Sequence, residues 1–135
     1  MIHFEITVAG NPISSQARNR QLLAEWKQHV YETARRSWGR RRPLKQQLQI
    51  VCVYYHDRPS VTLDIDNLIK PIQDVLKTLV YRDDVQIVDA VLRKTQLDTP
   101  LRVRRISGIL ARAFMEGKEF VYIKVEDPPD HSIIL

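Results

Sequence analysis

The sequence predicts a single small α/β domain in which a β-sheet of mixed strand direction is covered by packed helices. The 135 residues match the commonest size of one compact domain, so residues 1–135 are expected to form one core. With 44% hydrophobic and 27% charged residues, the chain has enough apolar surface for that core. Strand-like and helix-like patterns alternate in the order β-α-β-α-β-α-β, which indicates the α/β class.

The first part of the chain predicts a strand followed by a helix. Apolar and polar residues alternate over residues 2–8, which is the period of a half-buried strand, and a Gly-Asn-Pro turn ends it. After a polar loop, apolar residues recur every four positions from Leu22 to Ala34, which predicts a helix. Gly39 is expected to end this helix.

Residues 48–55 are rich in β-branched and aromatic side chains and predict a central strand. Cys52 lies within this run, where a buried and inert thiol is expected rather than a nucleophile. The polar residues 56–59 predict a turn. His56 and Asp57 are not interpreted as a catalytic pair, because neighbours in an extended chain point to opposite faces.

The next apolar stripe predicts a helix that begins near Ile65 and runs to Val80. Pro71 has no N–H group and is costly deep inside a helix, so the helix should begin only a few residues earlier. Asp66 or Asn67 is expected to cap it.

The last part of the chain predicts two strands and a short helix. Residues 85–94 predict a strand with both faces covered, and residues 107–115 predict a short helix that Gly117 ends. Residues 119–125 predict the final strand, and residues 127–135 are expected to form a loose tail.

Charge is unevenly distributed around the net value of +5. Residues 1–63 hold ten Lys/Arg against four Asp/Glu, residues 64–100 hold five against seven, and residues 101–135 hold six against five. A basic surface around an acidic centre suits a protein that attracts a polyanion and holds a divalent cation. A basic net charge alone favours nucleic acid only weakly.

Several classes of protein are not expected. No apolar run approaches the roughly 20 residues that cross a bilayer, and the N-terminal residues lack the basic start of a secretory signal. We therefore expect a cytoplasmic protein without membrane contact. The single cysteine argues against disulfides and cysteine-ligated zinc.

Acidic residues gather where the second helix begins. In an extended segment, residues i and i+2 point the same way, so Asp64 and Asp66 are expected to converge on one ion. Mg²⁺ binds hard oxygen ligands, usually one or two carboxylates together with waters and substrate phosphate. The alternative is a turn and a helix cap, both of which are common roles of Asp.

Two further features also have two interpretations. Asp83 and Asp84 form a second acidic pair, and the alternative is a turn before a strand, because the spacing does not require this pair to meet the first. Lys70 lies four residues after Asp66 on the polar face of the helix. It either forms i,i+4 ion pairs, worth roughly a few tenths of a kcal/mol, or stabilises developing charge on a phosphate. Spacing alone favours the ion pair.

Taken in order, these residues resemble the signature of the RusA family of Holliday junction resolvases, closely so over residues 62–94. The similar residues are Asp64-x-Asp66-Asn67-Leu68-x-Lys70, Asp74 and Asp83-Asp84-x-Gln86-x-Val88-Asp89. The resemblance implies a homodimer with one metal site per subunit. It also implies Mg²⁺-dependent endonuclease cleavage of four-way or other branched DNA, in recombination and repair, with Mn²⁺ as a possible substitute ion.

The resemblance assigns individual roles as well. Asp64, Asp66 and Asp84 match the metal-binding carboxylates, and Lys70 matches the catalytic lysine. Asn67 and Asp83 are expected to orient these groups or to cap the chain beside them. Asp83 remains the alternative third ligand, because the connection before it differs slightly in length from that of the family.

Seven arginines are candidates for contacts that position a DNA backbone without reading its sequence. They are Arg18, Arg20, Arg35, Arg36, Arg40, Arg41 and Arg42. Two other functions compete: a branched-DNA-binding protein of the same fold without catalysis, and an enzyme acting on a small phosphorylated substrate. The carboxylates beside Lys70 argue against the first, and the lack of a Gly-rich phosphate loop argues against the second.

Overall fold

The computed structural model describes residues 1–102 and 104–135 and confirms the α/β class and the order of its elements. The elements are β1 (Ile2–Ala9), α1 (Arg20–Trp38), β2 (Leu48–His56), α2 (Ile65–Leu76), the 3₁₀ helix η1 (Asp84–Gln86), β3 (Ile87–Gln96), α3 (Gly108–Glu116) and β4 (Phe120–Glu126). No helix in the described part of the chain has both the length and the apolar character needed to cross a membrane.

The four strands form one sheet in the order β1-β4-β2-β3. β4 pairs antiparallel with β1 and β2, and β3 pairs parallel with β2, so the predicted mixed sheet is confirmed. β2 lies inside the sheet, as expected of a central strand. Within the described part of the chain, β3 lies at the edge of the sheet and pairs only with β2. Its side chains are only partly buried, and Ala90 and Arg93, which point to opposite faces, are exposed. The expectation that both faces of this strand are covered is therefore wrong.

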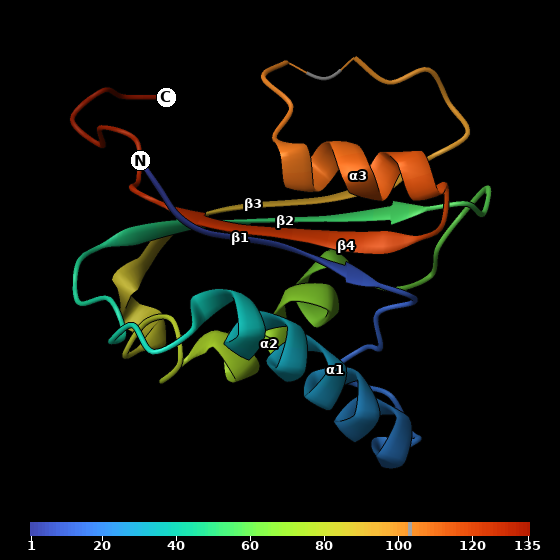
Figure 1. The fold of residues 1–135 in the computed structure, drawn as a ribbon, viewed down its shortest axis with the longest axis horizontal. Coiled ribbons are helices and arrows are strands. Elements are labelled where there is room, and N and C mark those ends of the chain that lie inside the picture. Colours follow the sequence, from blue (N-terminus) through green and yellow to red (C-terminus); the bar gives the residue numbers. More distant parts are fainter. Residues whose placement is uncertain (103) are drawn as a thin grey trace.

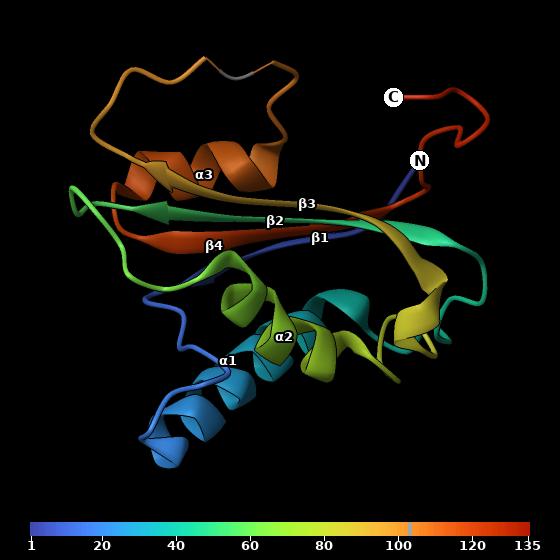
Figure 2. The ribbon, with the colours of Figure 1, turned by 180° about the vertical axis from the view of Figure 1, so that it is seen from behind.

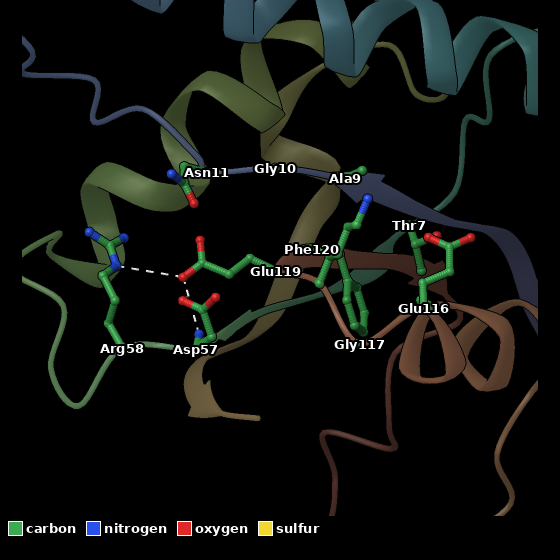
Figure 3. A pocket seen from close by; sticks show the side chains of 12 residues that line it. Thr7, Ala9, Gly10, Asn11, Asp57, Arg58, Glu116, Gly117, Glu119 and Phe120 are labelled. Atoms are coloured by element: carbon green, nitrogen blue, oxygen red, sulfur yellow. Dashed lines mark hydrogen bonds and ion pairs between the residues drawn. The ribbon is translucent and has the colours of Figure 1, made fainter. Parts of the chain in front are cut away.

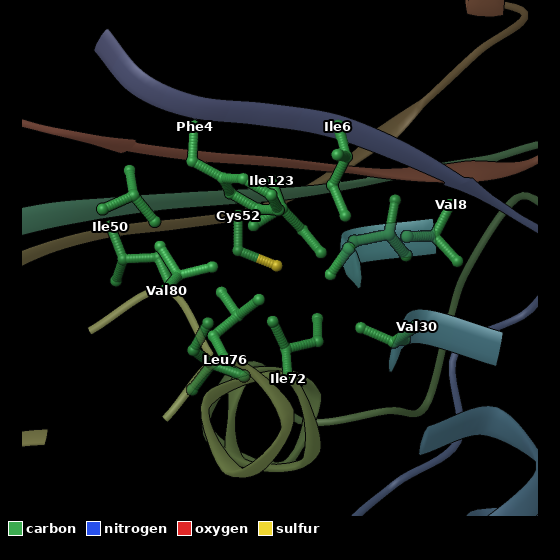
Figure 4. Close-up of a cluster of buried hydrophobic side chains, with 14 of the residues drawn as sticks. Phe4, Ile6, Val8, Val30, Ile50, Cys52, Ile72, Leu76, Val80 and Ile123 are labelled. Carbon is green, nitrogen blue, oxygen red and sulfur yellow. The ribbon is translucent and has the colours of Figure 1, made fainter. Parts of the chain in front are cut away.

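Helices pack on both faces of the sheet. α1 and α2 cover one face, and α3 covers part of the other (Figures 1 and 2). The larger core lies between the sheet and the first two helices, where side chains of the sheet such as Ile50 face side chains of α2 such as Ile72 (Figure 4). Cys52 is fully buried there, which confirms the expected burial of this thiol, and burial raises its pKa to about 12. A smaller core beneath α3 includes Val53 and Phe120.

The first and third helices form as predicted. In α1, Trp26, Val30 and Ala34 are buried at helical spacing. Gly39 ends this helix with a φ of 70°, a conformation that costs glycine little. α3 begins after the capping residue Ser107, and the described residues after β4 form neither helix nor strand.

The second helix differs from its prediction at both ends. Its N-cap residue is Asp64, not Asp66 or Asn67, and the helix ends at Leu76 rather than Val80. Thr78 has a φ of 71°, which is incompatible with a continuing α-helix. Val80 is nevertheless fully buried in the same core, which is why the apolar pattern continues beyond the helix.

The segment before β3 is a 3₁₀ turn and not the start of the strand. Asp83 caps η1, and its side chain and that of Gln86 form a reciprocal capping box. Val85 is 80% exposed, so its predicted place on a buried strand face is wrong. His56, expected in a turn, is instead the buried last residue of β2.

Candidate active site

The N-terminus of α2 faces a hollow of about 300 Å³. Asp64 and Asn67 line this hollow, together with residues 12–14 and 61–63. The Ser15 hydroxyl donates to Asn67 Oδ1 at 2.9 Å, and the Ser15 backbone N–H donates to the Asn67 carbonyl at 3.1 Å. The loop before α1 is thereby fastened to the first turn of α2 and forms one wall of the hollow.

Asp64 holds the N-cap position, yet its side chain makes no capping hydrogen bond. The residue is exposed and lines the hollow, so its carboxylate is accessible to a ligand. Asp66 lies in the first helical turn and is also exposed. Because the helix begins at Ile65, the extended backbone on which the predicted convergence of the two carboxylates rested is absent.

Lys70 lies on the exposed side of α2 and forms an ion pair. Its ammonium nitrogen is 3.1 Å from Asp74 Oδ1, and Asp74 Oδ2 is 3.2 Å from the Nζ atom of Lys27 on α1. The hydrogen bond with Asp74, its charge and the charge of Asp84 raise the pKa of Lys70. The i,i+4 ion pair favoured by spacing is therefore present, and the lysine also lies within the field of Asp84.

The second acidic pair divides into two different environments. The buried Tyr81 donates its hydroxyl to Asp84 Oδ1 at 3.1 Å, and the same hydroxyl is 3.5 Å from the Gln73 carbonyl of α2. Burial and the charge of Asp84 raise the pKa of Tyr81. Asp83 instead accepts the backbone N–H of Val85 at 3.2 Å within the turn. Asp84 is thus tied to α2, and Asp83 has a local capping role.

Among the described residues, no three Asp, Glu, His or Cys side chains lie close enough together to hold a metal ion. The donor chemistry nevertheless suits Mg²⁺, which usually takes one or two carboxylates and completes its shell with waters and phosphate. Asp64 and Asp66 offer such oxygens at the start of α2. Asp84 begins η1, outside this helix, and its charge acts on Lys70 of α2.

The seven candidate arginines do not form one patch. Arg18 is exposed beside the loop that walls the hollow, and Arg20 donates to the Ser15 and Ala17 carbonyls at 3.0 and 3.2 Å. The other five lie at the opposite end of α1, about 28 Å away for a helix of 19 residues. There Arg41 stacks on Trp38 at 3.7 Å.

The roles of the other four arginines also differ. Arg35 donates to the Gly39 carbonyl at the end of α1. Arg36, Arg40 and Arg42 are exposed.

One group of polar residues beside the site was not found from the sequence. Figure 3 shows Arg58 and Asp57 next to Glu119, at the rim of a second hollow of about 810 Å³ that contains none of the predicted carboxylates. The Asp57 N–H donates to Glu119 Oε1 at 3.1 Å, and the Tyr54 hydroxyl donates to Glu119 Oε2 at 2.9 Å. A hydrogen bond between the side chains of Asp57 and Glu119, followed by burial, raises the pKa of Asp57. These residues are 62 positions apart in sequence, so no local spacing could reveal them.

The fold and the site define a small mixed α/β domain that carries carboxylates and a lysine along one exposed helix face. The model of the endodeoxyribonuclease RusA family matches residues 5–105, which include all of these residues, so the chain belongs to this family. The chain is also similar to "Uncharacterized protein YqaN" of Bacillus subtilis (strain 168), with 36% identity over 54 residues. That match spans 38% of each chain, so the chain covers well under two thirds of the relative.

Proposed function

We propose that this protein is a Mg²⁺-dependent endonuclease that cleaves four-way or other branched DNA. The observation that carries the proposal is the family match over residues 5–105, which contains Asp64, Asp66, Lys70 and Asp84 in the expected order. Mn²⁺ is expected to replace Mg²⁺, since both ions take oxygen ligands. Net charge of +5 and exposed arginines favour binding to a polyanion.

In this proposal Asp64 and Asp66 at the start of α2, together with Asp84 of η1, would hold the ion. A divalent ion at this place supplies charge neutralisation at the scissile phosphate and lowers the pKa of bound water. Lys70 stabilises negative charge on the phosphate, after exchanging its exposed ion pair with Asp74 for the DNA. Tyr81 and Asn67 keep Asp84 and the helix start in place.

The assembly that suits this reaction is a homodimer, because a four-way junction presents two equivalent strands and a two-fold dimer presents two equivalent sites. Light scattering should then give about twice the chain mass of 15.8 kDa. A mass of one chain, with and without DNA, would contradict paired incision.

The proposal is tested with a synthetic four-way junction in Mg²⁺. Wild type should nick it, whereas Asp64→Asn, Asp66→Asn and Asp84→Asn should each bind it without nicking. Asparagine preserves side-chain size but removes the charge that attracts the ion. Asp89→Asn is the matched control, because Asp89 lies on β3 and contacts His131 at 3.0 Å. Nicking by all three variants at the wild-type rate would show that the site is wrong.

A second candidate is a branched-DNA-binding protein of the same fold that does not cleave. It is favoured by the ion pair of Lys70 with Asp74 and by the lack of a three-carboxylate cluster among the described residues. Tight, salt-dependent junction binding by the wild type without nicking in either Mg²⁺ or Mn²⁺ would support it.

A further inference from the structure

Arg58 lines both of the hollows described above. Its side chain lines the 300 Å³ hollow that contains Asp64 and Asn67, and it also lines the larger hollow beside Glu119 (Figure 3). The Arg58 side chain is 53% exposed, so it is accessible to a ligand that enters either hollow. Arg58 is therefore a cation in the same cavity as the proposed metal-binding carboxylate.

The guanidinium is held in a fixed position. Its Nη2 atom donates to the Tyr54 hydroxyl at 2.9 Å, and its Nε atom lies 3.5 Å from Glu119 Oε1. Tyr54 is only 1% exposed, so this support is rigid. A guanidinium has five N–H donors, and these contacts, among the described residues, engage Nε–H and one Nη2–H, which leaves both Nη1 donors and the second Nη2 donor for a ligand.

The arginine is not needed to satisfy Glu119. That carboxylate already accepts the Asp57 N–H and the Tyr54 hydroxyl. The additional contact with Arg58 is longer than these two hydrogen bonds, at 3.5 Å, and the Arg58 side chain remains half exposed although Glu119 is largely buried. A planar, preorganised fork of donors beside a carboxylate that binds a metal ion is instead suited to a phosphodiester, which guanidinium binds with two parallel hydrogen bonds.

We propose that Arg58 binds a backbone phosphate of the DNA strand next to the bond that is cut, with Tyr54 and Glu119 as its positioning residues. This inference rests on the proposed nuclease function, because it uses Asp64 to mark the place of the reaction. It adds a phosphate-binding residue from the β2–α2 connection, outside the acidic motif.

The test combines arginine variants with neutralised phosphates. Junctions carry a single methylphosphonate at successive positions around the cleaved bond, and binding is measured without divalent ions. For wild type, neutralising one phosphate should weaken binding about tenfold. Arg58→Ala should bind all junctions more weakly, and neutralising that one phosphate should not weaken its binding further. The slope of log binding constant against log salt concentration should be smaller in magnitude by about 0.9. Arg58→Lys keeps the charge without the fork and should recover part of the loss.

Arg112→Ala is the matched control, because Arg112 is exposed on α3, on the other face of the sheet. It removes the same charge and should behave as wild type in the phosphate series. Thermal melting checks that Arg58→Ala and Arg58→Lys are folded. If both folded variants keep the wild-type sensitivity at every phosphate, and the wild type cuts the junction, the role of Arg58 is overturned and the proposed nuclease function stands. A wild type that neither binds nor cuts overturns both.

Discussion

The hydrogen bond from Tyr81 to Asp84 links the stability of the fold to the proposed chemistry, and Tyr81→Phe removes it alone. Tyr81 is fully buried, and its hydroxyl is 3.1 Å from Asp84 Oδ1. A hydrogen bond to a charged group contributes roughly 1.5–3 kcal/mol, and the lower part of that range applies because Asp84 is partly exposed. We expect a loss of about 1.5–2 kcal/mol in the free energy of unfolding, or a fall in Tm of roughly 5–8 °C.

The same substitution should slow cleavage. If about 1.4 kcal/mol of this interaction serves to position Asp84 for the reaction, its loss raises the activation barrier by that amount, and the rate of junction nicking falls about tenfold. The matched control is Tyr122→Phe, which removes a 2.5 Å hydrogen bond to Glu5 on the other face of the sheet. Both variants should lose stability, but only Tyr81→Phe should lose activity, measured well below the Tm of each. Equal rates for the two variants would refute the role of Tyr81 in holding Asp84.

The pH dependence of this bond follows from the direction of the shift. Burial and the charge of Asp84 raise the pKa of Tyr81, so the hydroxyl stays protonated and donates throughout the neutral and mildly alkaline range. Because the pKa of Tyr81 is higher in the folded than in the unfolded state, its contribution to stability is complete below the unfolded pKa of about 10. That contribution is lost as the pH rises from there through the folded pKa. The Tm difference between wild type and Tyr81→Phe should therefore not change between neutral and mildly alkaline pH.

Three further predictions concern other parts of the molecule. Cys52, with a thiol pKa raised to about 12 by burial, should not react with a thiol reagent at neutral pH until denaturant unfolds the chain; fast labelling of the native protein would contradict the buried core. Lys70→Ala should leave the free energy of unfolding nearly unchanged, because its ion pair is exposed, yet should strongly reduce nicking; a melting curve and a junction assay on one preparation separate the two effects. Mn²⁺ should raise the Tm of wild type but not of Asp64→Asn, and equal increases would place the ion elsewhere.

The sequence predicts an element correctly where the apolar pattern stops at the same residue as the helix or strand. The alternation in β1 reflects a strand with one buried face, and α1 ends where a glycine with positive φ follows. α2 was extended too far because buried Val80 continues the apolar pattern after Thr78 has ended the helix. The spacing of apolar residues reports which side chains are buried in the core. It does not report where the helix ends, because side chains beyond the helix end can be buried in the same core.

The candidate site was predictable only in part, for a similar reason. The order of acidic residues and Lys70 is a local property and led to the family, which the match over residues 5–105 confirms. Whether the carboxylates converge depends on tertiary placement. The contacts of Arg58 with Tyr54 and Glu119 join three segments that no single pattern connects.

The start of α2 shows how the fold leaves a carboxylate available for a ligand. An N-cap aspartate usually accepts a backbone N–H, and this bond contributes about 1 kcal/mol. Asp64 makes no such bond, although it has the N-cap position. The first turn is fixed instead by the two hydrogen bonds between Ser15 and Asn67. Because a distant loop holds the helix start, the carboxylate of Asp64 is free to face the hollow that it shares with Arg58.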